Sequence, residues 1–337
     1  MISFPDFIGC KKGLPRHKMK KVVITFRVNE EQRELINSIF ENTAQTEFIR
    51  DYNKEEFDRV LKDTEILFAW NPVRELKHVK KDSFNKIEFV QLLSAGFDHI
   101  DFNWFPPDCK IASNKGAYAG PMAEHILAMI LAVYKNLFEN HKKLSAGEFN
   151  QRGVNRSLKD SICGILGYGG IGKATADLLK AFGTKIYAIN TSGRTNDTVD
   201  FTGTLKDLKY VVRNSDVIVI SLPLNRETDG IINKTRLELM KPNAVLVNAA
   251  RGEIIVEKDL YEHLKSRPEF HACIDAWWVE PFTAGEFRLN YPFFDLPNIL
   301  GSPHNSAMVP GIFLSGIKKA SLNILDFLNG NKADTIN

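Results

Sequence analysis

Short apolar runs alternate with longer polar stretches along this chain, in two successive series. In the first series, strands are predicted at Lys21–Val28, Glu65–Ala69, Lys86–Leu92 and Lys110–Ala112, and a helix at Glu30–Phe40. In the second, strands are predicted at Ile162–Leu166, Lys185–Ile189, Asp216–Ser221, Ala244–Asn248, His271–Asp275 and Asn298–Gly301. Apolar runs of this length are typical of strands buried in parallel sheets. Because helical sequence separates them, the pattern predicts an α/β protein with two doubly wound parallel sheets.

Two amphipathic stretches lie outside this alternation. Pro121–Leu144 separates the two series, and its apolar residues recur at helical spacing. We predict that it bridges two domains and contributes to the core or to a subunit interface. Ile312–Leu328 is also amphipathic, and we expect it to return to the first domain. The predicted organisation is a first domain of residues 1–119 with a C-terminal return at 308–337, and a second domain of residues 120–307.

Composition narrows the function classes. A chain of 337 residues suggests about two domains. The 44 basic residues nearly balance the 41 acidic ones, which argues against an electrostatic nucleic-acid binder. The longest apolar candidate, Ile126–Val133, is shorter than the roughly 18 residues of a membrane span. The four cysteines form no C-x-x-C pair, so no zinc or thioredoxin-like motif is indicated. We therefore expect a reduced, cytoplasmic protein.

The N-terminus carries a basic cluster. Its members are Lys11, Lys12, Arg16, His17, Lys18, Lys20 and Lys21. No apolar segment of a secretory signal follows it. We predict a solvated tail rather than a nucleic-acid or targeting segment, and Met19 is an alternative start of the chain.

A glycine-rich loop follows the first strand of the second series. It reads Gly167-Tyr168-Gly169-Gly170-Ile171-Gly172, and a helix is predicted from Lys173 to Phe182. A G-x-G-x-x-G sequence between strand and helix is typical of a dinucleotide site. The glycines allow a tight turn, close approach of the pyrophosphate and close helix packing, and the helix N-terminus attracts the phosphates. The alternative is a glycine-rich turn that binds no ligand.

Three side chains with complementary chemistry follow later strands of the same series. They are Arg251, Glu280 and His304. The carboxyl ends of parallel strands share one rim of a sheet, so we expect all three beside the glycine loop. A histidine can protonate a growing alkoxide, a carboxylate can orient the imidazole, and an arginine can grip a substrate carboxylate. This set suits hydride transfer to a 2-keto acid. Taken singly, each residue could instead be a structural ion-pair or surface residue.

The ordered motifs resemble those of the D-isomer-specific 2-hydroxyacid dehydrogenases. The matching segments are residues 164–172, 247–252, 275–281 and 302–304, together with 94–98 and 123–125. The resemblance covers nearly everything from Lys21 onward. It implies a Rossmann NAD(P)-binding domain and a flavodoxin-like substrate domain, with a homodimer formed through the region of Pro121–Leu144.

The resemblance also assigns roles to individual residues. It implies that Arg251, Glu280 and His304 are catalytic, and that the backbone at Ala95 and Gly96 receives the substrate carboxylate. It places Asp275 near the nicotinamide carboxamide. Around the cofactor it places Leu222, Pro223, Thr228 and Ala249, in addition to the glycine loop and the residues after the second strand, Asn190, Thr191, Ser192 and Arg194.

Several departures from the family pattern are informative. Gly170 stands where relatives often carry a basic residue, and Phe149 replaces a frequent tryptophan. The segment between Glu280 and His304 looks longer than usual. Most importantly, Asn190 stands where NAD-preferring relatives place an acid on the ribose hydroxyls. Without that carboxylate, and with hydroxyls and Arg194 nearby, the loop suits a 2′-phosphate. We predict a preference for NADP over NAD; the alternative is that Asn190 binds the ribose of NAD.

The leading functional prediction is an NAD(P)-dependent reductase of small 2-keto acids, with no nucleic-acid, membrane or metal partner. Glyoxylate or hydroxypyruvate is the first expected substrate class, and phosphoglycerate oxidation is second. Two alternatives stay open: a nucleotide-sensing corepressor-like binding protein, and a formate-dehydrogenase-like enzyme, for which Asn71-Pro72 leaves room.

Overall fold

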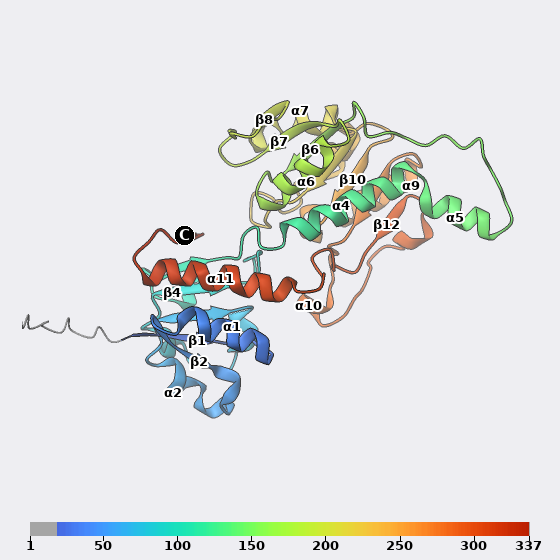
Figure 1. Ribbon diagram of the computed structural model, residues 1–337. Helices are drawn as coiled ribbons and strands as arrows, with labels where there is room; N and C mark the ends of the chain where they lie inside the picture. The colour runs from blue at the N-terminus through green and yellow to red at the C-terminus, as the bar shows by residue number, and fades with distance from the viewer. Residues whose placement is uncertain (1–18, 337) are drawn as a thin grey trace, which may run out of the picture. The chain divides into compact units, whose positions relative to one another are not determined.

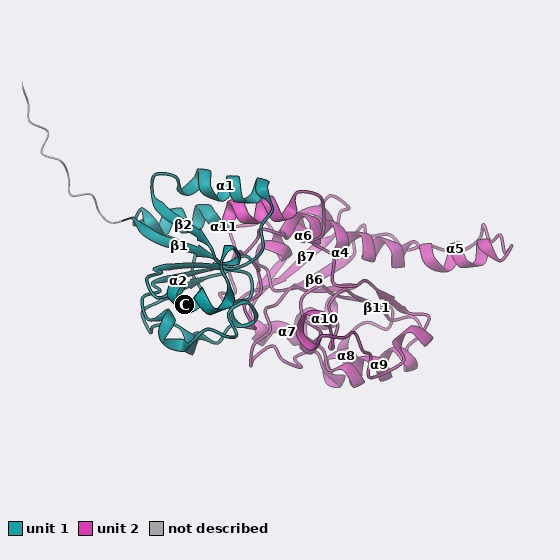
Figure 2. Cartoon of the chain, turned by 90° about the horizontal axis from the view of Figure 1, so that it is seen from below, with its two compact units in different colours: residues 1–93, 100–113, 320–337 teal, residues 94–99, 114–319 magenta. Residues whose placement is uncertain are grey.

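The computed structural model describes residues 19–336. The part of the basic cluster from Lys11 to Lys18 and the cysteine at position 10 lie outside that range. The chain divides into two compact units (Figure 2). Unit 1 takes the chain up to Leu93, Ile100–Ser113 and the chain from Ala320 onward, and unit 2 takes Ser94–His99 and Asn114–Lys319. The domain boundaries at 119/120 and 307/308 stay predictions.

Unit 1 is built on one parallel sheet of five strands. They are β1 (Lys20–Ile24), β2 (Ala44–Phe48), β3 (Ile66–Ala69), β4 (Phe89–Leu92) and β5 (Lys110–Ala112). The spatial order is β2-β1-β3-β4-β5, which is the flavodoxin-like order. The sequence did not predict β2, because this edge strand is mostly polar and only its end residues are buried.

Among the described residues, three α-helices lie wholly in unit 1, and the second and third are short. They are α1 (Glu30–Phe40), α2 (Phe57–Leu61) and α3 (Pro72–Glu75). Asn29 and Gln32 form a reciprocal capping box at the start of α1, which satisfies N–H groups that lack helical partners. The predicted first strand extends four residues too far, since β1 ends at Ile24 rather than at Val28.

Unit 2 is built on a seven-stranded parallel sheet. Its strands are β6 (Ile162–Leu166), β7 (Lys185–Ile189), β8 (Phe201–Gly203), β9 (Val217–Ile220), β10 (Val245–Asn248), β11 (His271–Ile274) and β12 (Ile299–Gly301). The order is β12-β11-β10-β9-β6-β7-β8. From β6 the chain continues through β7 and β8 to one edge of the sheet, and then through β9 to β12 to the other edge. The strand order therefore reverses between β6 and β9, as in a Rossmann fold. The prediction of two doubly wound parallel sheets is confirmed, and the short edge strand β8 is an addition to it.

Helices cover both faces of this sheet. The helices of unit 2 are α4 (Ala119–Tyr134), α5 (Leu137–Ser145), α6 (Gly170–Lys180), α7 (Leu208–Asn214), α8 (Lys234–Leu239), α9 (Glu257–Ser266) and α10 (Pro281–Ala284), and α11 (Ile312–Leu328) runs from unit 2 into unit 1. Ile165 packs into the core with α4 and α6, and its neighbour Leu166 packs into the core with α7, α8 and α9. Successive residues of a strand point to opposite faces, so one apolar run supplies both cores.

The single helix predicted at Pro121–Leu144 is wrong. Helix α4 ends at Tyr134, and α5 begins only at Leu137. Between them Asn136 adopts a left-handed conformation with φ of 50°, which interrupts the helix. Figure 1 shows that α5 projects beyond the other helices of unit 2. None of the helices formed by the described residues is long and apolar enough to cross a membrane.

Candidate active site

The glycine loop lies at the point of unit 2 where the strand order reverses. Gly167 follows β6 directly and has a φ of 101°, a conformation that favours glycine. A methyl group on Gly172 would approach the Gly167 carbonyl oxygen to 2.4 Å. Helix α6 begins at Gly170, three residues earlier than predicted. Its first free N–H groups therefore belong to the glycine-rich sequence itself, which suits an anion at this end.

Gly169 shows that the loop fits a pyrophosphate. A methyl group there would meet only Lys115, whose Cε would lie 3.9 Å away. Unlike Gly167 and Gly172, Gly169 is therefore not required by the protein's own packing. Its missing side chain keeps backbone accessible to a ligand, which is the role of the second glycine in a dinucleotide loop. The loop residues thus fit the pyrophosphate of a dinucleotide.

The structure also explains the absence of a basic residue at position 170. A methyl group on Gly170 would approach the Cα of Gly116 to 2.8 Å, so a long side chain cannot enter without moving backbone. The residue before Gly116 is Lys115, an exposed lysine close to the glycine loop. It brings a positive charge to the place where position 170 lacks one.

The predicted specificity residues form a tight turn after β7. The Asn190 side-chain oxygen accepts hydrogen bonds from the Gly193 N–H at 2.7 Å and from the Ser192 hydroxyl at 3.1 Å. Its amide nitrogen donates to the Arg194 carbonyl at 2.9 Å. Asn190 therefore organises the turn, while Thr191, Ser192 and Arg194 are exposed. Among the residues that the structure describes, no ion pair engages the Arg194 guanidinium.

The other predicted cofactor residues line the ends of β6, β9 and β10. Tyr168, Leu222 and Ala249 are buried, and Pro223 is exposed. Thr228 is also buried, and its hydroxyl donates to the Pro223 carbonyl at 2.6 Å. Thr228 thus fixes the loop that carries Leu222 and Pro223.

Arg251 lies in a turn that Asn248 holds in shape. The buried Asn248 side chain donates to the Arg251 carbonyl at 2.8 Å and accepts from the Ala250 N–H at 3.1 Å. The Arg251 guanidinium donates to Asp98, with Nη2 3.0 Å and Nε 3.2 Å from Oδ1. A methyl group on Gly96 would lie 2.0 Å from Nη2. Unit 2 therefore contains Arg251 together with the Ala95-Gly96 segment.

Carboxylates surround this arginine. Burial alone would raise the pKa of Asp98, but the charge of Arg251 and its hydrogen bond outweigh that cost, so the pKa lies below its usual value. For Glu253 the balance is opposite. Burial raises its pKa, and the negative charges of Asp98 and Glu280 add to the rise. One guanidinium thus faces several acidic groups, and the carboxylate of Asp98 is the one that it binds.

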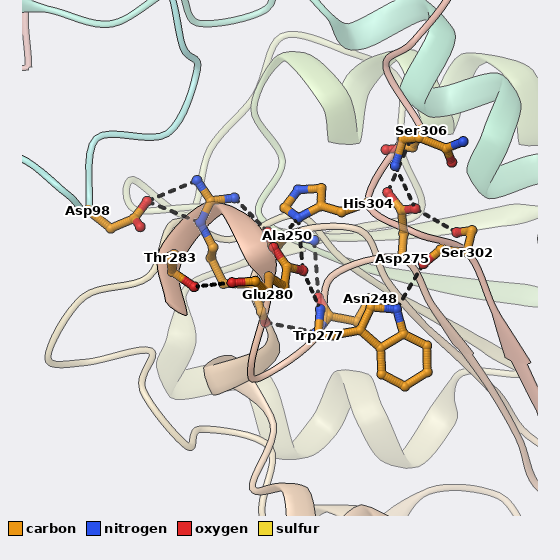
Figure 3. Close-up of polar contacts among 12 residues, drawn as sticks. Asp98, Asn248, Ala250, Asp275, Trp277, Glu280, Thr283, Ser302, His304 and Ser306 are labelled. Atoms are coloured by element: carbon orange, nitrogen blue, oxygen red, sulfur yellow. Dashed lines mark hydrogen bonds and ion pairs between the residues drawn. The ribbon is translucent and has the colours of Figure 1, made fainter. Parts of the chain in front are cut away.

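Glu280 and His304 form a close pair (Figure 3). The His304 Nδ1 lies 2.7 Å from Oε2 and 2.9 Å from Oε1 of Glu280. A carboxylate only accepts hydrogen bonds, so Nδ1 carries the proton. Among the described residues, Nε2 of His304 makes no hydrogen bond. His304 has a φ of 50°, and its side chain is 34% exposed. The ring is thus oriented on one side and open to a ligand on the other.

Asp275 is fully buried, and its carboxylate is held by the loop that carries His304. It accepts from the Ser302 hydroxyl at 2.5 Å and from the backbone N–H groups of Asn305 and Ser306 at 3.3 Å. The Nε2 of His125 lies 3.0 Å from the Ser302 oxygen. The buried Asp275 carboxylate therefore anchors the loop that carries His304.

Sequence reasoning missed several of these contributors. Asn248 and Trp277 lie within matched segments and Lys115 lies outside them, and none of these residue types gives a functional signal. Asp98, His125 and Ser302 lie within matched segments that assign them no role. A usable signal existed only for Asp98, because it follows the Ala95-Gly96 segment that was expected to meet substrate.

Comparisons with known proteins identify a family of similar proteins. The model of the family described as "D-isomer specific 2-hydroxyacid dehydrogenase, NAD binding domain" matches residues 127–306. The chain is 27% identical over 300 residues to a glyoxylate reductase of Pyrococcus furiosus, covering 84% of this chain and 85% of that protein.

Two further proteins are informative. The chain is 28% identical to a D-3-phosphoglycerate dehydrogenase of Methanocaldococcus jannaschii over 86% of this chain, but over only 54% of that protein. The crystal structure of a glycerate dehydrogenase related protein from Thermoplasma acidophilum is similar, with a TM-score of 0.60 and 30% identity, covering 91% of this chain and 99% of that one.

Proposed function

This chain belongs to the D-isomer specific 2-hydroxyacid dehydrogenase family, and we propose that it reduces small 2-keto acids, with glyoxylate or hydroxypyruvate as the favoured substrates. Oxidation of phosphoglycerate is the second candidate. The similarity to the Pyrococcus furiosus glyoxylate reductase supports this order. The observation that carries the proposal is the His304–Glu280 pair, which fixes Nδ1 and leaves Nε2 available, in the same unit as Arg251 and the glycine loop.

The chain's own groups account for the proton and for substrate orientation. A bound reduced nicotinamide supplies a hydride to the carbonyl carbon of the keto acid. Protonated His304 donates its Nε2 proton to the carbonyl oxygen as negative charge grows there. Glu280 holds the ring and stabilises its charged form. Arg251 binds the substrate carboxylate through its planar fork, assisted by backbone at Ala95 and Gly96. In this scheme the substrate carboxylate replaces Asp98 on the guanidinium.

The experiment that tests the function is a panel of 2-keto acids assayed with NADPH and NADH. We expect turnover of glyoxylate or hydroxypyruvate, and we expect His304→Ala to lower kcat/KM by about 10²–10⁴-fold. His78→Ala is the matched control, because this exposed histidine lies in unit 1. Absence of turnover across the panel would favour the corepressor-like protein, and turnover of formate alone would favour the formate-dehydrogenase-like enzyme.

The cofactor preference is part of the proposal. The turn after β7 presents Thr191, Ser192 and Arg194 to solvent, and no carboxylate occupies position 190. Lys115 would add a charge near the pyrophosphate. We expect a lower KM for NADPH than for NADH, and we expect Arg194→Ala to raise the NADPH value selectively. A clear preference of the unchanged protein for NADH would contradict it.

A homodimer is also proposed. Helix α5 and the segment after it expose large apolar side chains: Leu137, Phe138, Leu144, Phe149 and Val154 are each more than half exposed. Several exposed large apolar side chains on one segment favour a protein–protein contact there. Light scattering should give twice the mass of one chain, and Phe138→Asp should reduce the measured mass to that of one chain.

We also propose a cytoplasmic location. The buried free thiols at Cys109, Cys163 and Cys273 support it, and cell fractionation would test it.

A further inference from the structure

Trp277 touches all three loops that carry Arg251, Glu280 and His304. Its backbone N–H donates to Oε1 of Glu280 at 2.6 Å. Its indole N–H donates to the Ser302 carbonyl at 2.8 Å (Figure 3). The side chain is only 5% exposed. One residue therefore connects the carboxylate of the catalytic pair with the loop that carries the histidine of the pair.

Two glycines make room for this tryptophan. A methyl group on Gly252, the residue after Arg251, would approach the Trp277 backbone to 2.4 Å. A methyl group on Gly301, just before Ser302, would approach the indole ring to 2.7 Å. The turn after β10 and the end of β12 are therefore packed directly against Trp277. A residue at this place controls the relative position of the three loops.

We propose that Trp277 is a positioning residue that sets the geometry of the Glu280–His304 pair through its two hydrogen bonds. The predicted loss of activity rests on the proposed function. The predicted change in the geometry of the Glu280–His304 pair does not. Loss of the indole donor leaves the Ser302 carbonyl without this partner, and the His304 loop gains freedom to move away from Glu280. The imidazole then loses the contact that selects its tautomer.

Trp278 provides a matched control within the same aromatic cluster. Its indole N–H also donates to a backbone carbonyl, that of Ile255, at 2.7 Å. Its ring stacks on Phe293 with a centroid distance of 5.4 Å, and Trp277 contacts the same phenylalanine at 6.4 Å. The neighbouring tryptophan is thus similar in chemistry, but its hydrogen bond does not reach the loops of Glu280 and His304.

The experiment compares Trp277→Phe with Trp278→Phe in the full-length protein. We expect Trp277→Phe to lower kcat by about tenfold and to shift the pH profile, with KM for the cofactor unchanged. Trp278→Phe should keep kcat within about twofold. In parallel, ¹⁵N chemical shifts of the His304 ring report its tautomer without any turnover. The Nδ1–H form should be retained in the unchanged protein and in Trp278→Phe, and it should be mixed with the other tautomer in Trp277→Phe.

The proposal is overturned if the His304 ring keeps the Nδ1–H form in Trp277→Phe as it does in Trp278→Phe. The tautomer measurement needs no turnover of substrate. Failure of the proposed function is therefore distinguishable from failure of the inference. If Trp277→Phe does not fold, Trp277 can be replaced by benzothienylalanine, a tryptophan analogue in which sulfur takes the place of the indole N–H. This analogue keeps the ring shape and removes only the hydrogen-bond donor. The same tautomer readout then decides the outcome.

Discussion

Glu75 of unit 1 and Glu280 of unit 2 both lie beyond the carboxyl end of a parallel strand, but they serve different purposes. Glu75 accepts from the Thr25 hydroxyl at 2.6 Å and from the backbone N–H groups of Asn71 and Trp70 at 3.1 and 3.3 Å. Glu280 accepts from the Trp277 N–H and from the His304 ring. The donors to Glu75 all belong to its own sheet edge, whereas the imidazole on Glu280 has a second nitrogen to offer.

Position in the fold and local chemistry both decide what these carboxylates do. The carboxyl edge of a parallel sheet collects polar side chains in either unit. In unit 1 these contacts connect the residues that follow β1 and β3 to each other through Glu75. In unit 2 they orient a group that still has an unused hydrogen-bonding atom. The function therefore depends on which atoms the local contacts leave unused.

The largest expected effect separates the two glutamates by activity. Glu280→Gln should lower kcat/KM by about 10²-fold or more, because an amide can donate to the imidazole and no longer stabilises its charge. Glu75→Gln should leave kcat/KM within about twofold. Initial rates with the best keto acid measure both. Equal losses in the two variants would mean that Glu280 is only a structural residue.

The same distinction between internal and available groups applies within the glycine loop. Gly172→Ala should destabilise the protein by about 1–3 kcal/mol, since its methyl group would overlap the Gly167 carbonyl. Gly169→Ala should keep the Tm and raise the KM for the cofactor by about tenfold, because only the ligand needs that space. Thermal melting and cofactor titration measure the pair. A large fall in Tm for Gly169→Ala would refute the assignment.

A smaller effect concerns stability in unit 1. Glu75→Gln should lower the free energy of unfolding by about 1–2 kcal/mol, because one acceptor atom is lost beside the buried Thr25 hydroxyl. Glu280→Gln should cost less, since its remaining oxygen can still accept from Trp277. Urea unfolding followed by fluorescence measures both variants. A larger loss for Glu280→Gln would reverse the comparison.

The smallest expected effect is the pH dependence of the Asp98–Arg251 pair. The pKa of Asp98 is lower in the folded protein than its ordinary value, so the pair stabilises the fold above the unfolded pKa of about 3.9. That contribution is lost as the pH falls through the lower, folded pKa. Asp98→Asn should therefore reduce stability by at most about 1 kcal/mol at pH 6, and the difference should disappear in acid. Urea unfolding at several pH values checks the trend, and a constant difference would contradict it.

Most of both sheets could be predicted from the chain, because buried parallel strands are continuous apolar runs. The exceptions have physical reasons. Strands β2 and β8 lie at sheet edges and are partly polar, so their sequences carry no such run. The break at Asn136 was also missed, since the apolar spacing on its two sides continues across it. Pairing and chain reversal depend on neighbours that a local pattern does not reveal.

The family resemblance, the dinucleotide loop and the candidates Arg251, Glu280 and His304 can all be inferred from the amino-acid sequence. These follow from residue types at fixed offsets from apolar strands, and such offsets are local properties of the chain. The contacts that hold these residues in place depend on the folded chain. Glu280 meets His304, the Trp277 indole N–H meets the Ser302 carbonyl, and the space at Gly170 is taken by Gly116. These contacts join residues that are distant in sequence, so their geometry exists only once the strands have paired and the loops have packed against one another.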